Sequence, residues 1–380
     1  MMILLIATAA SPNSMSNFKI LKKSKKTDSR LGVINTAHGK IKTPFFMPDA
    51  TRGYVKALSI SDLESSGVEA AVVNTYHLYL QPGIKLIKKA GGIHSFMNWK
   101  QPLLSDSGGF QVFSLAHRAK MGKITDKSVI FKSPLDGSMH ELTPEKAIKI
   151  QFDLGVDMMV CLDDCPPNSS TTEQLQDSVA RTIAWAQRCK IEYAKQVKKR
   201  KLKIAPLLFA VIQGGNDLEL RKSCAESLVA IGFDGYGFGA MPTNAAGEFS
   251  DEILKYTASL IPEQALRFAL GIGRPQDIVK CFKYGWDMFD CVIPTREGRH
   301  GRIFQEHKNK LAAVNIKNAK FISDFSVINK DSKILSLRTH TKAFLNHLFR
   351  MDDTSALRLA SLNNLEIYNN LLAKIRKNFV

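Results

Sequence analysis

The feature that most constrains the fold is a repeated alternation of short apolar runs with helical patterns. The runs are continuous rather than alternating in polarity, which is typical of parallel strands buried on both faces. They lie at 45–47, 70–73, 102–104, 158–162, 207–212, 236–238, 268–270 and 288–293. This count of about eight favours an α/β (β/α)8 TIM barrel over an open doubly wound sheet, and no G-x-G-x-x-G follows the first strand.

Several intervening helices have predictable boundaries. Thr143-Pro144 predicts the start of a helix that Gly155 ends, and Ser170-x-x-Glu173 predicts a capping box at the start of a long one. Further amphipathic helices are expected over 217–230 and 250–261, and another near 276.

The regions outside the barrel are predicted from simpler signals. Strands over 18–21, 32–34 and 41–47 predict an antiparallel start to the fold. Met15 has the context of a natural start, so residues 1–14 are expected to be disordered or an over-called extension. We therefore expect a catalytic barrel with this β-sheet start over 15–305 and a helical C-terminal subdomain over 306–380.

Composition narrows the class of partner. The chain has 380 residues and a formal net charge of +18, which favours a polyanion such as nucleic acid, although general lysine enrichment is the alternative. Its six cysteines lack the spacing of a disulfide framework, which fits the cytoplasm. No apolar run approaches the ~18 residues of a membrane span, so no membrane partner is expected.

Polar residues or glycines follow the predicted strands, at Asn74, Asp106, Asp163, Gln213, Gly239, Gly271 and Asp290. The carboxyl ends of barrel strands converge on one rim, where active sites form. Gln213 and Asp163 have the donors and acceptors to recognise a purine-like ring edge, and Gly239 lets the backbone approach it. Phe110 can stack on such a base. These residues predict a base-binding pocket.

The remaining carboxylates, Asp106 and Asp290, form a candidate catalytic pair, since paired carboxylates can displace at an anomeric carbon. Asp290 lies in an apolar run that Pro294 is expected to end, before a loop carrying Arg296 and Arg299. A structural Asp290 paired with Arg296 is the alternative on this stretch alone.

Four motifs, S-D-S-G-G-F-Q at 105–111, N-T-Y-H-L at 74–78, F-D-C-V-I-P-T-R-x-G-R at 289–299 and V-N-I-K-N-A-K-F at 314–321, closely resemble bacterial-type tRNA-guanine transglycosylases. The resemblance runs from about residue 18 to the C-terminus. It implies an irregular TIM barrel, a homodimer, and exchange of guanine at the wobble position of GUN-anticodon tRNAs for a 7-deazaguanine in the queuosine pathway. No cofactor is implied.

The resemblance also implies roles for individual residues. Asp290 would be the nucleophile at ribose C1′ and Asp106 the general acid/base. Arg296 and Arg299 would contact tRNA. The base-binding positions would be Ser107, Phe110, Asp163, Gln213, Gly239, Ala240, Met241 and Leu270.

Departures from the family pattern leave two points open. Ala240 replaces a glycine and Thr243 follows nearby, so the sequence does not decide between 7-aminomethyl-7-deazaguanine and queuine. Asp164 is a shorter acid than usual beside the pocket.

The largest departure concerns structural zinc. The family's ligand positions correspond here to Ser332, Ile334, Leu337 and Asn363, none of which supplies a thiolate or imidazole. We therefore expect no zinc in the subdomain. Packing of apolar side chains is expected instead, from Ile334, Leu335, Leu337, Phe344, Leu345 and Leu348.

Two rival functions stay open at this point. A non-catalytic tRNA-binding subunit of a heterodimer would not need Asp106 and Asp290, yet both are present. A related enzyme acting on DNA would not need the arginines after residue 294. An archaeal-type enzyme is disfavoured because no further RNA-binding domain follows Val380.

Overall fold

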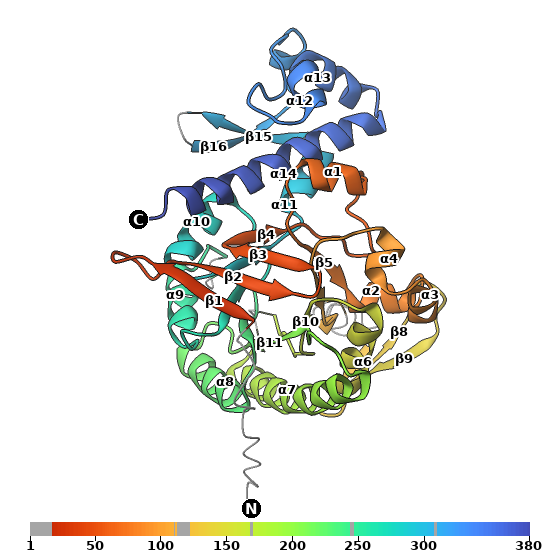
Figure 1. The fold of residues 1–380 in the computed structure, drawn as a ribbon, viewed down its shortest axis with the longest axis vertical. Coiled ribbons are helices and arrows are strands. Elements are labelled where there is room, and N and C mark those ends of the chain that lie inside the picture. The colour runs from red at the N-terminus through yellow and green to blue at the C-terminus, as the bar shows by residue number, and fades with distance from the viewer. Residues whose placement is uncertain (1–16, 110, 112–121, 168–169, 244–246, 308–309) are drawn as a thin grey trace, which may run out of the picture.

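Eight parallel strands form a nearly closed barrel in the computed structural model, which describes residues 17–109, 111, 122–167, 170–243, 247–307 and 310–380 (Figure 1). From β5 to β14 each barrel strand pairs with the next barrel strand along the chain, and β14 returns to pair with β4, whereas an isolated bridge between Asp49 and Val72 joins β4 to β5. Between β4 and β5 the Ala50 N–H donates to the Val72 carbonyl at 2.7 Å. The predicted irregular (β/α)8 barrel is confirmed. The strands are β4 (Phe45–Met47), β5 (Ala71–Asn74), β6 (Leu103–Asp106), β10 (Met158–Val160), β11 (Leu207–Ile212), β12 (Gly235–Phe238), β13 (Leu266–Ala269) and β14 (Met288–Asp290).

Both faces of this sheet are buried, which explains why the strands are apolar throughout. Alternate residues point to opposite faces of a strand. In β4, Phe45 and Met47 belong to the core inside the barrel, whereas Phe46 belongs to the core beneath the helices. An apolar run without polar alternation is therefore what this position in the fold requires.

Helices surround the barrel, and most begin at the predicted residues. Thr143 caps α6 and Gly155 ends it. The capping box of α7 was predicted one residue too early: Thr171 and Gln174 form it, because Ser170 is held in the preceding turn by a bond to the Pro167 carbonyl. No helix in the described part of the chain combines the length and apolarity needed to cross a membrane. The helices are α1 (Ile60–Ser65), α2 (Thr75–Leu80), α3 (Ile84–Lys89), α4 (Ile93–Met97), α6 (Pro144–Leu154), α7 (Thr172–Arg200), α8 (Leu218–Ile231), α9 (Asp251–Ser259) and α10 (Pro275–Lys283).

A three-stranded antiparallel sheet precedes the barrel, as predicted, and consists of β1 (Phe18–Lys23), β2 (Arg30–Thr36) and β3 (Gly39–Thr43). The predicted strand over 41–47 is two strands, because Pro44 separates β3 from β4. Phe18, Ile34 and Ile41 join the core inside the barrel. A second small sheet was not predicted: β7 (Gly122–Ile124), β8 (Val129–Lys132) and β9 (Met139–Leu142).

The C-terminal part of the chain packs around an apolar core of its own, and its strands and short helices between residues 302 and 350 lie on the far side of α14 (Thr354–Lys377) from the barrel in Figure 1. Leu337 and Leu345 are fully buried there, as predicted. Leu335 and Phe344 were predicted to pack but are 67% and 40% exposed, because they lie on the outer sides of their short helices. The other elements are α11 (Ile293–Arg299), β15 (Arg302–His307), β16 (Lys310–Asn315), a 3-10 turn (Ala319–Phe321), α12 (Leu335–Thr339) and α13 (Lys342–Arg350). The division near residue 305 stays a prediction, and residues 1–14 lie outside the described chain.

Candidate active site

The two predicted catalytic carboxylates end barrel strands at the same rim, Asp106 on β6 and Asp290 on β14. The Asn74 side-chain amide donates to Asp106 Oδ2 at 2.7 Å, and the Gly271 N–H donates to Asp290 Oδ1 at 2.8 Å. Burial raises the pKa of Asp106 to about 6. Burial, with the nearby charge of Asp106, raises the pKa of Asp290 to about 7. The two carboxyls therefore interact, and each gains a proton more readily than an ordinary Asp.

Three of the predicted base-binding residues come together beside this pair. The Gln213 amide donates to Asp163 Oδ2 at 2.7 Å, while Gln213 Oε1 is buried and has no partner among the described residues. Burial and the charge of Asp106 raise the pKa of Asp163 to about 7. A Cβ on Gly239 would lie 2.5 Å from Gln213 Cδ, so only glycine fits there. An orphaned amide oxygen beside a carboxyl is suited to hydrogen bonding with a polar ring.

The remaining predicted base contacts differ in their surroundings. Ser107 is fully buried and its hydroxyl accepts from the Gly109 N–H at 3.1 Å. Leu270 packs under Gly237, where an added Cβ would lie 2.3 Å from Leu270 Cδ1. Ala240 has a φ of +77°, a conformation that favours glycine. Met241 is 57% exposed. Phe110, the predicted stacking ring, lies outside the described residues.

Arg296 and Arg299, the predicted tRNA contacts, were expected on a loop. They lie on helix α11 instead, so the predicted loop was wrong. α11 begins at Ile293, and Pro294 fits its first turn because the first N–H groups of a helix need no internal partner. Arg296 is exposed and Arg299 is half-buried. Burial and the neighbouring Arg296 lower the pKa of Arg299. The pair presents two cations next to the strand that carries Asp290.

The structure adds a fourth carboxyl that the sequence reasoning missed. Asp49 follows β4, the first barrel strand, and burial together with the charges of Asp290 and Asp106 raises its pKa well above the ordinary value. The rule that found Asp106 and Asp290, a polar residue at a strand end, also applies to Asp49. Asn74, expected at a strand end and as the first residue of the N-T-Y-H-L motif, donates to both Asp106 and the Gln111 side chain.

A second residue that the sequence gave no reason to select is Arg221 on α8. Its guanidinium is fully buried and donates to three carbonyls, those of Ile212, Gly215 and Gly239, at 3.3, 2.8 and 2.9 Å. These carbonyls lie at the ends of β11 and β12, on either side of Gln213. Arg221 therefore holds the backbone on both sides of Gln213 and at Gly239.

The four positions expected to lack zinc ligands take part in other contacts. Leu337 is in the apolar core, and the Ser332 hydroxyl donates to Glu366 at 2.5 Å. The Ile334 N–H donates to Ser332 Oγ. Asn363 donates to the Phe304 carbonyl at 3.0 Å and lines a cavity of about 920 Å³. This residue set does not suit a zinc ion.

Comparison with known proteins gives consistent matches over nearly the whole chain. The sequence model of the queuine tRNA-ribosyltransferase family matches residues 25–379. The queuine tRNA-ribosyltransferase of Halothermothrix orenii is 40% identical over 360 residues, which cover 95% of this chain and 92% of that protein. The protein of the same name from Prochlorococcus marinus is 40% identical over 96% of this chain and 95% of its own length. That from Methylacidiphilum infernorum is 41% identical over 94% of each.

Proposed function

The chain belongs to the queuine tRNA-ribosyltransferase family, and from this premise we propose that it is a tRNA-guanine transglycosylase. The reaction would exchange guanine at the wobble position of GUN-anticodon tRNAs for a 7-deazaguanine. The observation that best supports this is the meeting of two interacting carboxyls, Asp106 and Asp290, with the Gln213–Asp163 pair at one rim.

Asp290 attacks C1′ of the ribose, forming an ester bond as the bond from C1′ to guanine N9 breaks. Guanine leaves after taking a proton, for which Asp106 with its pKa of about 6 is the suitable donor. The deazaguanine then binds and gives its N9 proton back to Asp106. Its N9 attacks C1′ and releases the Asp290 carboxylate, so protons and charges balance over the cycle.

Recognition of the base would use the polar wall described above. Gln213 Oε1 would accept a hydrogen bond from a ring amine or N–H, which would satisfy a buried oxygen that has no described partner. Asp163 would accept from the neighbouring donors of the same ring edge. Ser107, Ala240, Met241 and Leu270 would line the pocket, and Phe110 would stack on the base.

The partner would be a polyanion, in keeping with the net charge of +18. Arg296 and Arg299 would contact phosphates beside the anticodon. A homodimer, which the family resemblance implies, and a cytoplasmic location, where tRNA is modified, belong to the same proposal.

The proposed reaction exchanges one glycosidic bond for another and so needs neither ATP nor a redox cofactor. We also propose that the C-terminal subdomain holds no zinc. Its 329–334 loop is tied to α14 by Glu366, which accepts from the Ser332 hydroxyl at 2.5 Å and from the Lys333 N–H at 2.7 Å. Together with the core around Leu337, these bonds would replace the metal.

Exchange of labelled guanine into a GUN-anticodon tRNA tests the proposal. The wild-type protein should incorporate label, and Asp290→Asn should reduce incorporation to background because the amide is a poor nucleophile. Asp136→Asn, on an exposed turn, is a matched control that should keep full activity. An inert wild type would refute the proposed activity. Competition between 7-aminomethyl-7-deazaguanine and queuine would then identify the incoming base.

A further inference from the structure

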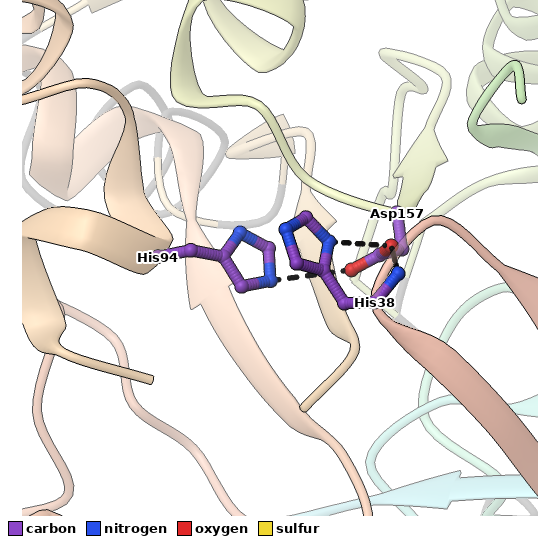
Figure 2. A group of neighbouring side chains, drawn as sticks. All are labelled: His38, His94 and Asp157. Atoms are coloured by element: carbon purple, nitrogen blue, oxygen red, sulfur yellow. Dashed lines mark hydrogen bonds and ion pairs between the residues drawn. The ribbon is translucent and has the colours of Figure 1, made fainter. Parts of the chain in front are cut away.

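Three side chains that can bind a metal lie together at the end of the barrel opposite the catalytic carboxyls (Figure 2). Asp157 immediately precedes β10, His38 lies in the turn between β2 and β3, and His94 lies on α4. His38 Nδ1 is 2.9 Å from Asp157 Oδ1, and His94 Nε2 is 3.3 Å from Asp157 Oδ2. One donor atom from each residue lies within 4.8 Å of the others.

Asp157 has the electrostatic character of an anionic ligand. Burial by itself would raise its pKa, but hydrogen bonds from His94, the Leu103 N–H and His38 lower the pKa below the ordinary value. The carboxylate is therefore ionised at neutral pH although its side chain is completely buried. Both imidazoles contact the Asp157 carboxylate, and an imidazole is charged only when it is protonated. The buried Asp157 carboxylate and the two imidazoles together offer a divalent cation carboxylate oxygens and two ring nitrogens.

We propose that His38, His94 and Asp157 form a binding site for a divalent transition-metal ion such as Zn²⁺. Imidazole nitrogens and a carboxylate oxygen suit this class of ion. Each imidazole would bind the ion through the nitrogen that faces Asp157, with a proton on its other ring nitrogen, and His94 Nε2 would give up its 3.2 Å contact with the Gln101 carbonyl. Zinc bonds of about 2.0–2.1 Å in a tetrahedron separate ligand atoms by about 3.3–3.4 Å. The two imidazole nitrogens lie 2.9 and 3.3 Å from different oxygens of Asp157, so small shifts would bring them to these separations. Water fills the fourth position.

Metal binding also requires one ring to move. The imidazoles of His38 and His94 are stacked, with centroids 3.5 Å apart and planes 11° from parallel. Lone pairs lie in the ring planes, so two parallel rings cannot both point at one ion. The side chain of His38 is 35% exposed on its turn, whereas that of His94 is 10% exposed, so His38 is the ring that tilts. The bound ion then fastens the β2–β3 turn to α4 and to the barrel.

Metal analysis of the full-length protein tests this proposal. Tag-free protein is stripped with a chelator, dialysed against ZnCl2 and analysed for zinc, and Co²⁺ is titrated as a coloured probe of the ligand set. The wild type should bind one equivalent. His38→Gln and His94→Gln should each bind zinc at least about tenfold more weakly, since each removes one of the three protein ligands. The glutamine amide can still donate to Asp157, so these variants should fold.

The matched control is the double variant His340→Gln/His347→Gln, which removes two imidazoles of the C-terminal subdomain and should keep the metal. The proposal is overturned if wild-type protein binds neither ion, if His38→Gln and His94→Gln retain wild-type affinity, or if the control loses the ion. Guanine exchange is measured separately, because this site does not depend on the proposed activity.

Discussion

Both ends of the barrel bury carboxylates, and two sets of them differ: Asp157 and Asp287 where the strands begin, and Asp106, Asp163 and Asp290 where the strands end. At the end where the strands begin, Asp287 is held by a bidentate bond from Arg30, at 3.0 and 2.6 Å, and by the Arg267 N–H. Asp157 at the same end accepts N–H groups from His38 and Leu103. At the rim where the strands end, Asp106, Asp163 and Asp290 have pKa values raised to about 6 to 7.

The difference teaches that pairing, and not burial, separates Asp157, whose pKa is lowered, from the carboxyls at the rim, whose pKa values are raised. Burial raises the pKa of a carboxyl at either end; at Asp157 hydrogen bonds outweigh burial, whereas at Asp106, Asp163 and Asp290 they do not. Carboxyl groups with raised pKa values lower the stability of the fold at neutral pH. They can also gain and lose protons near neutral pH. Clusters of this kind are typical of functional sites.

The largest expected change in the free energy of unfolding comes from breaking the buried Arg30–Asp287 ion pair where the strands begin. Arg30→Met should lower the free energy of unfolding by about 3–5 kcal/mol, because it leaves the buried Asp287 charge unpaired. Urea denaturation measures the change. Lys23→Met removes the exposed pair with Glu263 and should cost less than about 1 kcal/mol. Equal, small losses for both variants would show that Asp287 does not depend on its partner.

At the rim, Arg221→Lys should reduce kcat/KM for base exchange by about 10–100-fold, because an ammonium cannot hold three carbonyls as a guanidinium does. The loss should appear mostly in the KM for the base, since Arg221 positions the Gln213 wall and does not touch the reacting atoms. Lys222→Met, an exposed neighbour on α8, serves as control. Unchanged kinetics in a folded Arg221→Lys would contradict this positioning role.

A smaller effect should appear in stability. The folded-state pKa of Asp290 is raised from 3.8 to about 7, so folding loses free energy as pH rises through this window. Asp290→Asn should therefore be more stable than wild type at pH 8, by about 1 kcal/mol after allowance for partial exposure, and the gain should vanish near pH 4. Thermal unfolding at both pH values measures it. A destabilised Asp290→Asn at pH 8 would mean that the carboxylate is structural.

Asp136→Asn should change stability with pH in the opposite direction to Asp290→Asn, because the pKa of Asp136 is lowered and not raised. Hydrogen bonds from Ser138 lower the pKa of Asp136 to about 2, so its contribution is present above pH 4 and is lost as pH falls toward 2. The variant should therefore lose stability at neutral pH and match wild type in acid.

The barrel and the placement of Asp106 and Asp290 at one rim could be predicted because both follow from local sequence. A strand buried on both faces appears in the sequence as an apolar run. The polar residue that follows such a run is predicted to lie at one rim of the barrel. Asp49 was missed although the same rule applies to it. Arg221 and the His38–Asp157 contact could not be found this way, since each depends on segments that only the fold brings together. The β7–β9 sheet was missed because its strands are short and partly polar.

The most direct test of the central claim is to trap the covalent intermediate. Wild-type protein is incubated with GUN-anticodon tRNA without an incoming base, quenched with denaturant, and run on a denaturing gel. We expect a protein–RNA adduct with wild type and none with Asp290→Asn, with Asp136→Asn matching wild type. An adduct that persists in Asp290→Asn would contradict the assignment of Asp290 as nucleophile.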